Sequence, residues 1–197
     1  MSALRKVVLP AALILAVVCA SAYADETYTL DPAHSQPRYE IAHMRGLSIQ
    51  WGSFGKLAGK VTLDRAARKG SVEVTIDTMS IHSHDPRVDA ILKGPAYFNV
   101  EKYPTMSFKS AKLDFDGDQV VAAEGELTMI GVTRPVTLRV VNFACGENPF
   151  NKKPMCGGEA SASIKRSEWG MTAGLPNSSG DEVRIIIPIE AYRDDAG

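Results

Sequence analysis

The stretch TMSFKSAKLDFDGDQVVAAEGELTMI, residues 105–130, decides the fold class of this chain. Apolar and polar side chains alternate along residues 105–115 and again along residues 119–130. Such alternation is typical of β-strands, whose successive side chains point to opposite faces of a sheet. The intervening Asp116-Gly117-Asp118 contains the Asp-Gly pair that favours a tight hairpin turn. The stretch therefore predicts two long antiparallel strands.

The same alternation continues on both sides of this hairpin. Val72, Val74 and Ile76, for example, share one face of an expected strand. Ile186 breaks the alternation near the C-terminus, so we expect it to be an exposed outward residue that contacts a helix or a second copy of the chain. The further strands predicted by alternation cover residues 28–31, 38–43, 56–64, 71–77, 136–144, 159–169 and 182–192.

One short helix interrupts this pattern. Asp85 can cap a helix that begins at Pro86, and Gly94-Pro95 would end it. A parallel sheet would need a crossover helix between most strands, so the pattern favours an antiparallel meander. Closing the meander removes its unpaired edges. We therefore predict an all-β fold, an eight-stranded antiparallel barrel with one short helix in a loop, with a Greek-key sandwich as the alternative.

The first 24 residues have the form of a secretory signal peptide. Arg5 and Lys6 precede an apolar run over residues 7–20, and Ala22-Tyr23-Ala24 forms a cleavage site of small residues. A retained N-terminal anchor is the alternative. Lipid attachment at Cys19 is disfavoured because Val18 precedes it, where a lipidation motif has a small residue. We expect an exported domain over residues 25–197, with no later segment that spans a membrane.

Composition excludes several classes of protein. Of the 197 residues, 45% are apolar and 23% charged, and the formal net charge is −1. These values exclude a disordered tail, a collagen and a cysteine-dense miniprotein. A nucleic-acid-binding protein would carry a basic surplus, so we expect no nucleic-acid partner.

The residues with reactive or metal-binding side chains point to structure rather than chemistry. Cys145 and Cys156 flank a loop rich in Gly, Pro and Asn, and in an exported chain they most economically form a disulfide. His82 and His84 offer half a metal site, but no further ligands lie at suitable spacing, so we predict no metal.

A hydrolase site is also disfavoured by the sequence. His34 and Ser35 are adjacent and would point to opposite faces of a strand, so they cannot form a nucleophile and its base. The sequence contains no Gly-x-Ser-x-Gly motif. We predict no catalytic residues.

Five motifs in order along the chain resemble the YceI-like family of polyisoprenoid-binding domains. Each motif is short, but together they extend over nearly all of residues 25–197. They comprise Tyr28–Ser35 with His43-Met44 and Gly52–Phe54; Asp89–Leu92 with Phe98, Val100–Thr105 and Phe108; Gly125–Thr128 with Gly131–Val136; Ile164–Met171; and Val183–Ala191.

This resemblance implies a lipocalin-like barrel in the periplasm that holds an isoprenoid lipid, either a polyprenyl chain or an isoprenoid quinone, without a chemical step or a further cofactor. Ile91 and Ile130 stand where the family commonly has His, and Asn99 where it has Asp. Residues 36–39 also replace a more apolar run. These differences put the contacts to the lipid head group in doubt more than the fold.

The expected ligand contacts come from strand parity and from the motifs. Val72, Val136 and Val140 share the predicted inward faces. Two alternatives remain: the apolar residues fill a packed barrel, and Arg166 makes a structural ion pair. For the function, the alternatives are an enzyme that acts on the lipid, or a structural interaction domain whose barrel is filled by side chains. The predicted contacts are Tyr39, Ile41, His43, Phe54, Val74, Ile76, Asp89, Leu92, Phe98, Phe108, Leu127, Met129, Leu138, Arg166 and Trp169.

Overall fold

A computed structural model describes residues 25–195 of the chain. The predicted signal peptide over residues 1–24, including Cys19, lies outside the described residues. Within residues 25–195, no helix is both long enough and apolar enough to cross a membrane.

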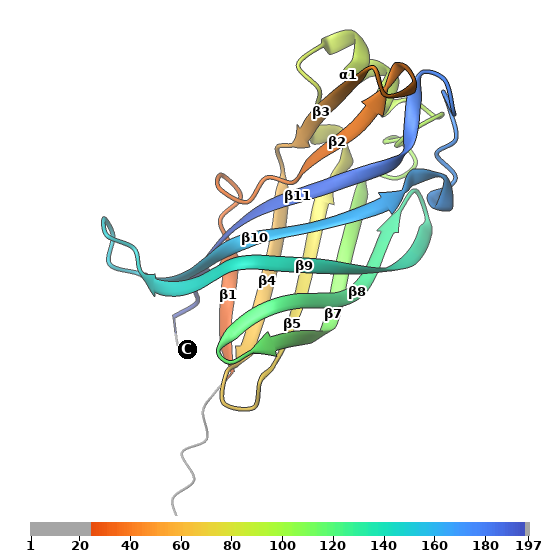
Figure 1. Ribbon diagram of the computed structural model, residues 1–197. Helices are drawn as coiled ribbons and strands as arrows, with labels where there is room; N and C mark the ends of the chain where they lie inside the picture. The colour runs from red at the N-terminus through yellow and green to blue at the C-terminus, as the bar shows by residue number, and fades with distance from the viewer. Residues whose placement is uncertain (1–24, 196–197) are drawn as a thin grey trace, which may run out of the picture.

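The chain folds as an eight-stranded closed antiparallel barrel (Figure 1). The strand β11 pairs with both β10 and β1, so the sheet returns to its first strand and the barrel is closed. The predicted all-β barrel is confirmed, and the sandwich alternative is excluded. The barrel strands in spatial order are β1 (Glu26–Leu30), β4 (Leu57–Asp64), β5 (Lys69–Asp77), β7 (Thr105–Asp116), β8 (Gln119–Met129), β9 (Val132–Glu147), β10 (Pro154–Lys165) and β11 (Ser179–Arg193).

Three further strands extend the wall at one end of the barrel. The first half of β11 pairs with β2 (Arg38–His43), which pairs with β3 (Ser48–Phe54), which pairs with β6 (Ile81–His82). The short helix α1 (Pro86–Lys93) lies beside β3 at this end (Figure 1). Three 3₁₀ turns complete the elements: η1 (Met44–Gly46), η2 (Thr78–Ser80) and η3 (Arg166–Trp169).

The hairpin of β7 and β8 and the helix α1 form as predicted. Asp116 pairs with Gln119, and Gly117 between them has φ 59°, a conformation that glycine adopts without steric cost. In α1, the Asp85 carboxylate accepts a hydrogen bond from the Arg87 amide at 2.9 Å and so caps the helix.

A β-bulge in β7 reverses the face that its side chains present. Met106 and Phe108 are buried before the bulge, and Leu113 is buried after it. At the bulge, the Ser110 hydroxyl donates to the backbone oxygen of Glu124 at 2.7 Å. The Lys112 amide donates to the same hydroxyl at 3.1 Å. The serine thus satisfies backbone groups that the bulge leaves without a strand partner.

Four local predictions from the sequence are wrong. The strand β3 was missed, although Ile49 and Trp51 alternate with Ser48 and Gln50; residues 48–51 are all exposed. Residues 166–169 form η3 rather than the end of a strand. Ile130 lies in a turn with φ 42°, after β8 has ended. Ile186 is only 6% exposed, flanked by Ser161 on β10 and Arg38 on β2, so it offers no exposed face to a partner.

The predicted disulfide joins Cys145 on β9 to Cys156 on β10, which are paired residues of one hairpin. Their sequence separation is 11. The disulfide therefore closes the short loop that carries the turn at residues 148–153.

Replacing both cysteines by serine should lower the free energy of unfolding by roughly 3 kcal/mol, because the unfolded chain regains the freedom of this loop. Urea denaturation measures the loss. A reducing agent should lower the stability of the wild-type protein to that of the double variant and leave the variant unchanged. Equal stability of the oxidised wild-type protein and the variant would contradict this prediction.

Candidate functional site

The barrel encloses a cavity of about 550 Å³. This volume lies within the range of 300 to 1,000 Å³ that is typical of small-molecule sites. The side chains that line it are predominantly apolar and come from the inward faces of the barrel strands, of β2 and β3, and of α1. The barrel is therefore not completely filled by its own side chains, in contrast to the packed-barrel alternative.

Most of the predicted ligand contacts are brought together around this cavity. Only Asp89 and Trp169 among them do not line it. The predicted contacts that do line the cavity are Tyr39, Ile41, His43, Phe54, Val74, Ile76, Leu92, Phe98, Phe108, Leu127, Met129, Leu138 and Arg166.

Asp89 binds the segment that leads into α1 instead of facing the cavity. Its Oδ1 accepts hydrogen bonds from the amide and the hydroxyl of Ser83, both at 2.6 Å, and its Oδ2 lies 3.3 Å from Nδ1 of His82. Burial acts to raise the pKa of Asp89, but the hydrogen bonds from Ser83 outweigh it and the pKa is lowered. In a catalytic triad the serine hydroxyl contacts the imidazole, whereas here the Asp89 carboxylate lies between the Ser83 hydroxyl and the His82 imidazole. This group is therefore not arranged as a nucleophile and its base.

Trp169 is a core residue rather than a cavity residue. Its side chain is 1% exposed, and its Nε1 donates a hydrogen bond to the backbone oxygen of Leu127 at 3.2 Å. The indole thereby fixes η3 against β8.

Arg166 lines the cavity and is held by neutral acceptors. It is 3% exposed; its Nε donates to the backbone oxygen of Gly180 at 2.8 Å and its Nη1 to that of Met171 at 2.7 Å. Nη2 donates to the backbone oxygen of Ala173 at 2.9 Å and to the Ser179 hydroxyl at 3.0 Å. Burial lowers the pKa of Arg166, but a guanidinium remains charged at any physiological pH. The predicted ion pair is therefore wrong: the guanidinium makes hydrogen bonds that connect η3 to the start of β11.

Tyr39 places a phenol in the cavity wall. Burial, with a smaller contribution from the charge of Asp89, raises its pKa to about 12, so the hydroxyl stays protonated and can donate a hydrogen bond. The ring lies against Gly52 on β3, where an added Cβ would be 2.5 Å from the Tyr39 hydroxyl. Only glycine leaves room for the phenol at this position.

The cavity opens at the end formed by β2, β3 and α1. Val88 and Ile91 of α1 line the cavity and are nevertheless 40% and 59% exposed. Sequence reasoning missed these two residues, because an apolar helix face gives no sign of which strands it covers. It also missed Val183 and Ile185 on β11, although that strand shows clear alternation. The other missed lining residues of this end are Arg38, Gln50, Trp51, Ser83, Asp85, Tyr97, Ser178 and Ser179.

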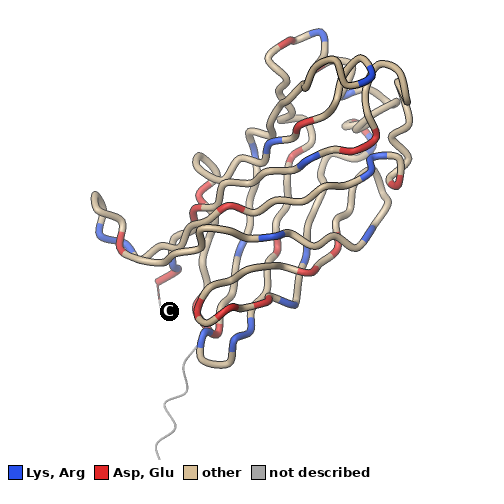
Figure 2. The backbone as a smooth tube through the Cα atoms, viewed as in Figure 1, with Lys and Arg blue, Asp and Glu red and all other residues tan. Residues whose placement is uncertain are grey.

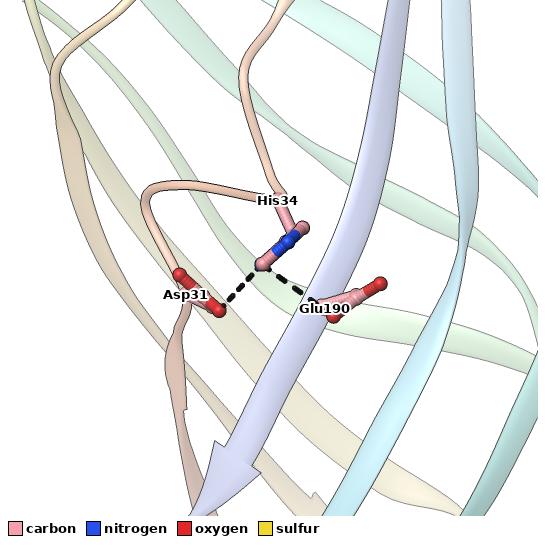
Figure 3. A group of neighbouring side chains, drawn as sticks. All are labelled: Asp31, His34 and Glu190. Carbon is pink, nitrogen blue, oxygen red and sulfur yellow. Dashed lines mark hydrogen bonds and ion pairs between the residues drawn. The ribbon is translucent and has the colours of Figure 1, made fainter. Parts of the chain in front are cut away.

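The pair His34 and Ser35 does not form a catalytic site. The Ser35 hydroxyl is buried, donates to the backbone oxygen of Glu190 and accepts from the Glu190 amide, both at 3.0 Å. His34 is exposed, and its Nδ1 lies 2.8 Å from Asp31 and 3.9 Å from the Glu190 carboxylate (Figure 3). The serine hydroxyl is thus bound to the backbone of β11, while the imidazole pairs with carboxylates at the surface.

With this geometry established, comparison with known proteins identifies the family. Residues 28–191 match the YceI-like domain. The chain belongs to the YceI-like family. "Protein YceI" of Salmonella arizonae is 33% identical over 161 residues, which cover 81% of this chain and 82% of the relative. The relative of the same name from Salmonella enteritidis has the same identity and coverage.

Solved structures share the fold of this YceI-like chain. BcnA of Burkholderia cenocepacia superimposes with a TM-score of 0.69 at 24% identity, covering 82% of this chain and 98% of BcnA. A polyisoprenoid binding domain from Saccharophagus degradans, implicated in plant cell wall breakdown, superimposes with a TM-score of 0.61 at 14% identity, covering 85% of this chain and 98% of that domain. The closed barrel is thus common to these proteins.

Replacing Arg166 by Lys should lower the free energy of unfolding by about 2–3 kcal/mol, because a single ammonium cannot reach the separated carbonyl oxygens that the guanidinium binds. Urea denaturation measures the loss. Arg184→Lys is the matched control, since the Arg184 side chain is 57% exposed and makes one ion pair, with Glu40 at 3.3 Å; its effect should be below about 1 kcal/mol. Similar losses in the two variants would contradict the role of Arg166.

The hydrogen bond that His34 Nδ1 donates to the Asp31 carboxylate raises the pKa of His34, and the same bond lowers the pKa of Asp31. The His34 contribution to stability is therefore fully present below its unfolded pKa of about 6.5 and is lost as the pH rises through the raised value. An NMR titration should show His34 titrating above about 6.5 in the wild-type protein and closer to it in Asp31→Asn. An unchanged titration in Asp31→Asn would contradict the pairing.

Proposed function

We propose that this protein is a periplasmic binding or carrier protein that holds an isoprenoid lipid in its barrel, without a chemical step. The observation that carries the proposal is the apolar cavity of about 550 Å³, closed along its sides by the barrel wall and open beside α1. A cavity of this shape suits a long apolar chain whose end lies at the opening.

Polar groups near the opening suit a weakly polar head group. Tyr39 supplies a hydrogen-bond donor in the cavity wall, and His43, which also lines the cavity, lies opposite Ser179 in the pairing of β2 with β11. A quinone carbonyl or a polyprenyl oxygen would accept from such donors. The isoprenoid class is favoured over other lipids by membership of the YceI-like family and by the Saccharophagus degradans neighbour, which is named as a polyisoprenoid binding domain.

The free energy of the bound lipid has to be compared with that of the lipid in a membrane rather than in water. Burying one methylene from water contributes about 0.8 kcal/mol, so a long polyprenyl chain transferred from water would exceed the affinity limit of about 21 kcal/mol. Such a lipid would otherwise lie in a bilayer, and ordering the flexible chain in the cavity costs free energy. A carrier is therefore expected to exchange its lipid with a membrane.

Two serines near the cavity support a binding role over catalysis. The Ser35 hydroxyl is bound to the backbone of Glu190, and the Ser83 hydroxyl donates to the Asp89 carboxylate, so each is engaged in a structural hydrogen bond. Periplasmic location is supported by the signal-peptide pattern of residues 1–24 and by the disulfide between Cys145 and Cys156.

Solvent extraction of the purified protein, followed by mass spectrometry, tests the proposal. We expect an isoprenoid lipid in the extract, and binding of added quinone or polyprenol after delipidation. Repeated absence of both would overturn the proposal and favour a structural domain. Chemical conversion of the bound lipid would instead indicate an enzyme.

Leu138→Trp should reduce the amount of bound lipid by about ten-fold, because the indole occupies space inside the cavity that Leu138 lines. Thr137→Trp is the matched control: Thr137 is the neighbouring residue on β9, and it is exposed on the outer face. Lipid content is measured by extraction, and circular dichroism checks that both variants are folded. Equal lipid content in the two folded variants would contradict binding inside the barrel.

A further inference from the structure

Exposed apolar side chains gather around the opening of the cavity. We call this group the mouth rim; it comprises Met44, Leu47, Ile49, Trp51, Val88 and Ile91. Leu47 is 88% exposed, and Ile49 and Ile91 are each 59% exposed. Large exposed apolar side chains that cluster on one surface mark an interaction site, whereas single ones do not.

The mouth rim is a continuous surface rather than separate residues. Met44 and Leu47 lie in the turn between β2 and β3, and Ile49 and Trp51 follow on β3. The Trp51 ring lies 4.2 Å from the ring of His84, which directly precedes the cap of α1. Figure 1 shows β3 and α1 side by side at this end of the barrel.

The same surface continues into the cavity. Trp51, Val88 and Ile91 are exposed and also line the cavity wall. An apolar chain that moves between the mouth rim and the cavity therefore stays in contact with apolar side chains. This continuity distinguishes the mouth rim from Phe150, which is 93% exposed on the turn between β9 and β10 and does not line the cavity.

Basic side chains lie next to the mouth rim. The Arg45 guanidinium, between Met44 and Gly46, donates to the neutral amide oxygen of Asn177 at 2.7 and 3.0 Å and so keeps its full charge. Lys93 lies in the last turn of α1. Figure 2 shows basic positions, in blue, together with acidic positions, in red, at this end of the molecule. Basic side chains beside exposed Leu, Ile and Trp are typical of surfaces that enter the interface of a phospholipid bilayer.

We propose that the mouth rim docks on a phospholipid bilayer, with Leu47, Ile49 and Trp51 in the interface and Arg45 at the level of the lipid phosphates. Docking would place the cavity opening against the bilayer, so that a lipid passes between the two without crossing water. This inference rests on the proposed function for the identity of the lipid, but docking itself is measured separately.

Flotation with vesicles of phosphatidylethanolamine and phosphatidylglycerol tests the inference. We expect the wild-type protein, residues 25–197, to float with the vesicles, and the double variant Leu47→Asp/Ile49→Asp to lose binding by about ten-fold or more, because charged groups replace apolar ones at the interface. Phe150→Asp is the matched control and should float like the wild-type protein. Since Leu47 and Ile49 are exposed, the double variant should keep the wild-type unfolding temperature.

Several outcomes would overturn docking. These are failure of the wild-type protein to float, equal flotation of the double variant, or an equal loss in Phe150→Asp. Sedimentation that shows a dimer of the wild-type protein, dissociated in the double variant while flotation is unchanged, would assign the mouth rim to a second copy of the chain.

The lipid content of each variant distinguishes this inference from the proposed function. A double variant that loses flotation but still takes up quinone or polyprenol from detergent supports both. A wild-type protein that floats but contains and takes up no isoprenoid lipid would retain the docking surface and overturn the proposed function.

Discussion

The strand β11 is the element on which the rest of the structure depends, because it changes its partner along its length. Its first half pairs with β2 and its last residues pair with β1. Between these two pairings, the Ser35 hydroxyl takes the place of a strand by bonding both the amide and the carbonyl of Glu190. Pro188 lies two residues before Glu190, so its backbone nitrogen faces the same gap and lacks the N–H that would need a partner there. At Pro188 and Glu190, therefore, no backbone N–H faces the gap without a partner.

This change of partner gives the cavity two parts with different structural origins. The closed barrel supplies apolar side walls, whereas β2, β3, α1 and the segments next to them supply the opening and its polar residues. Arg166 links the parts, since its guanidinium holds η3 and the start of β11 together at the boundary. The open end is the place where an apolar interior, hydrogen-bond donors and the mouth rim meet. The proposed binding of a lipid and the proposed docking on a bilayer therefore use one continuous surface rather than two separate sites.

Much of the barrel could be predicted because its strands follow simple alternation and its helix carries its own boundary residues. Asp85 and Pro86 start α1 where expected, and Asp116 to Gln119 form the predicted turn. The failures occur where burial does not follow local periodicity. Ser110 marks a bulge that shifts the inward face of β7, and residues 48–51 of β3 are exposed on both faces. The bulge has no signal in hydrophobic alternation, because it is a backbone irregularity. In β3, Ile49 and Trp51 do alternate with Ser48 and Gln50, but alternation alone does not show that both faces of this segment stay exposed.

The sequence by itself determined the antiparallel strands and the disulfide pair, and most of the residues that it singled out as ligand contacts do face the cavity, because side-chain parity along a strand is a local property. It could not separate residues that line the cavity from residues that support it. Asp89 is adjacent in sequence to the cavity residue Val88, and Trp169 lies two residues before the cavity residue Met171, yet one binds Ser83 and the other the backbone of β8. Only the tertiary structure decided that space remains inside the barrel, that the space opens beside α1, and that Arg166 is buried among neutral acceptors. These features depend on how strands distant in the sequence meet, which no local pattern encodes.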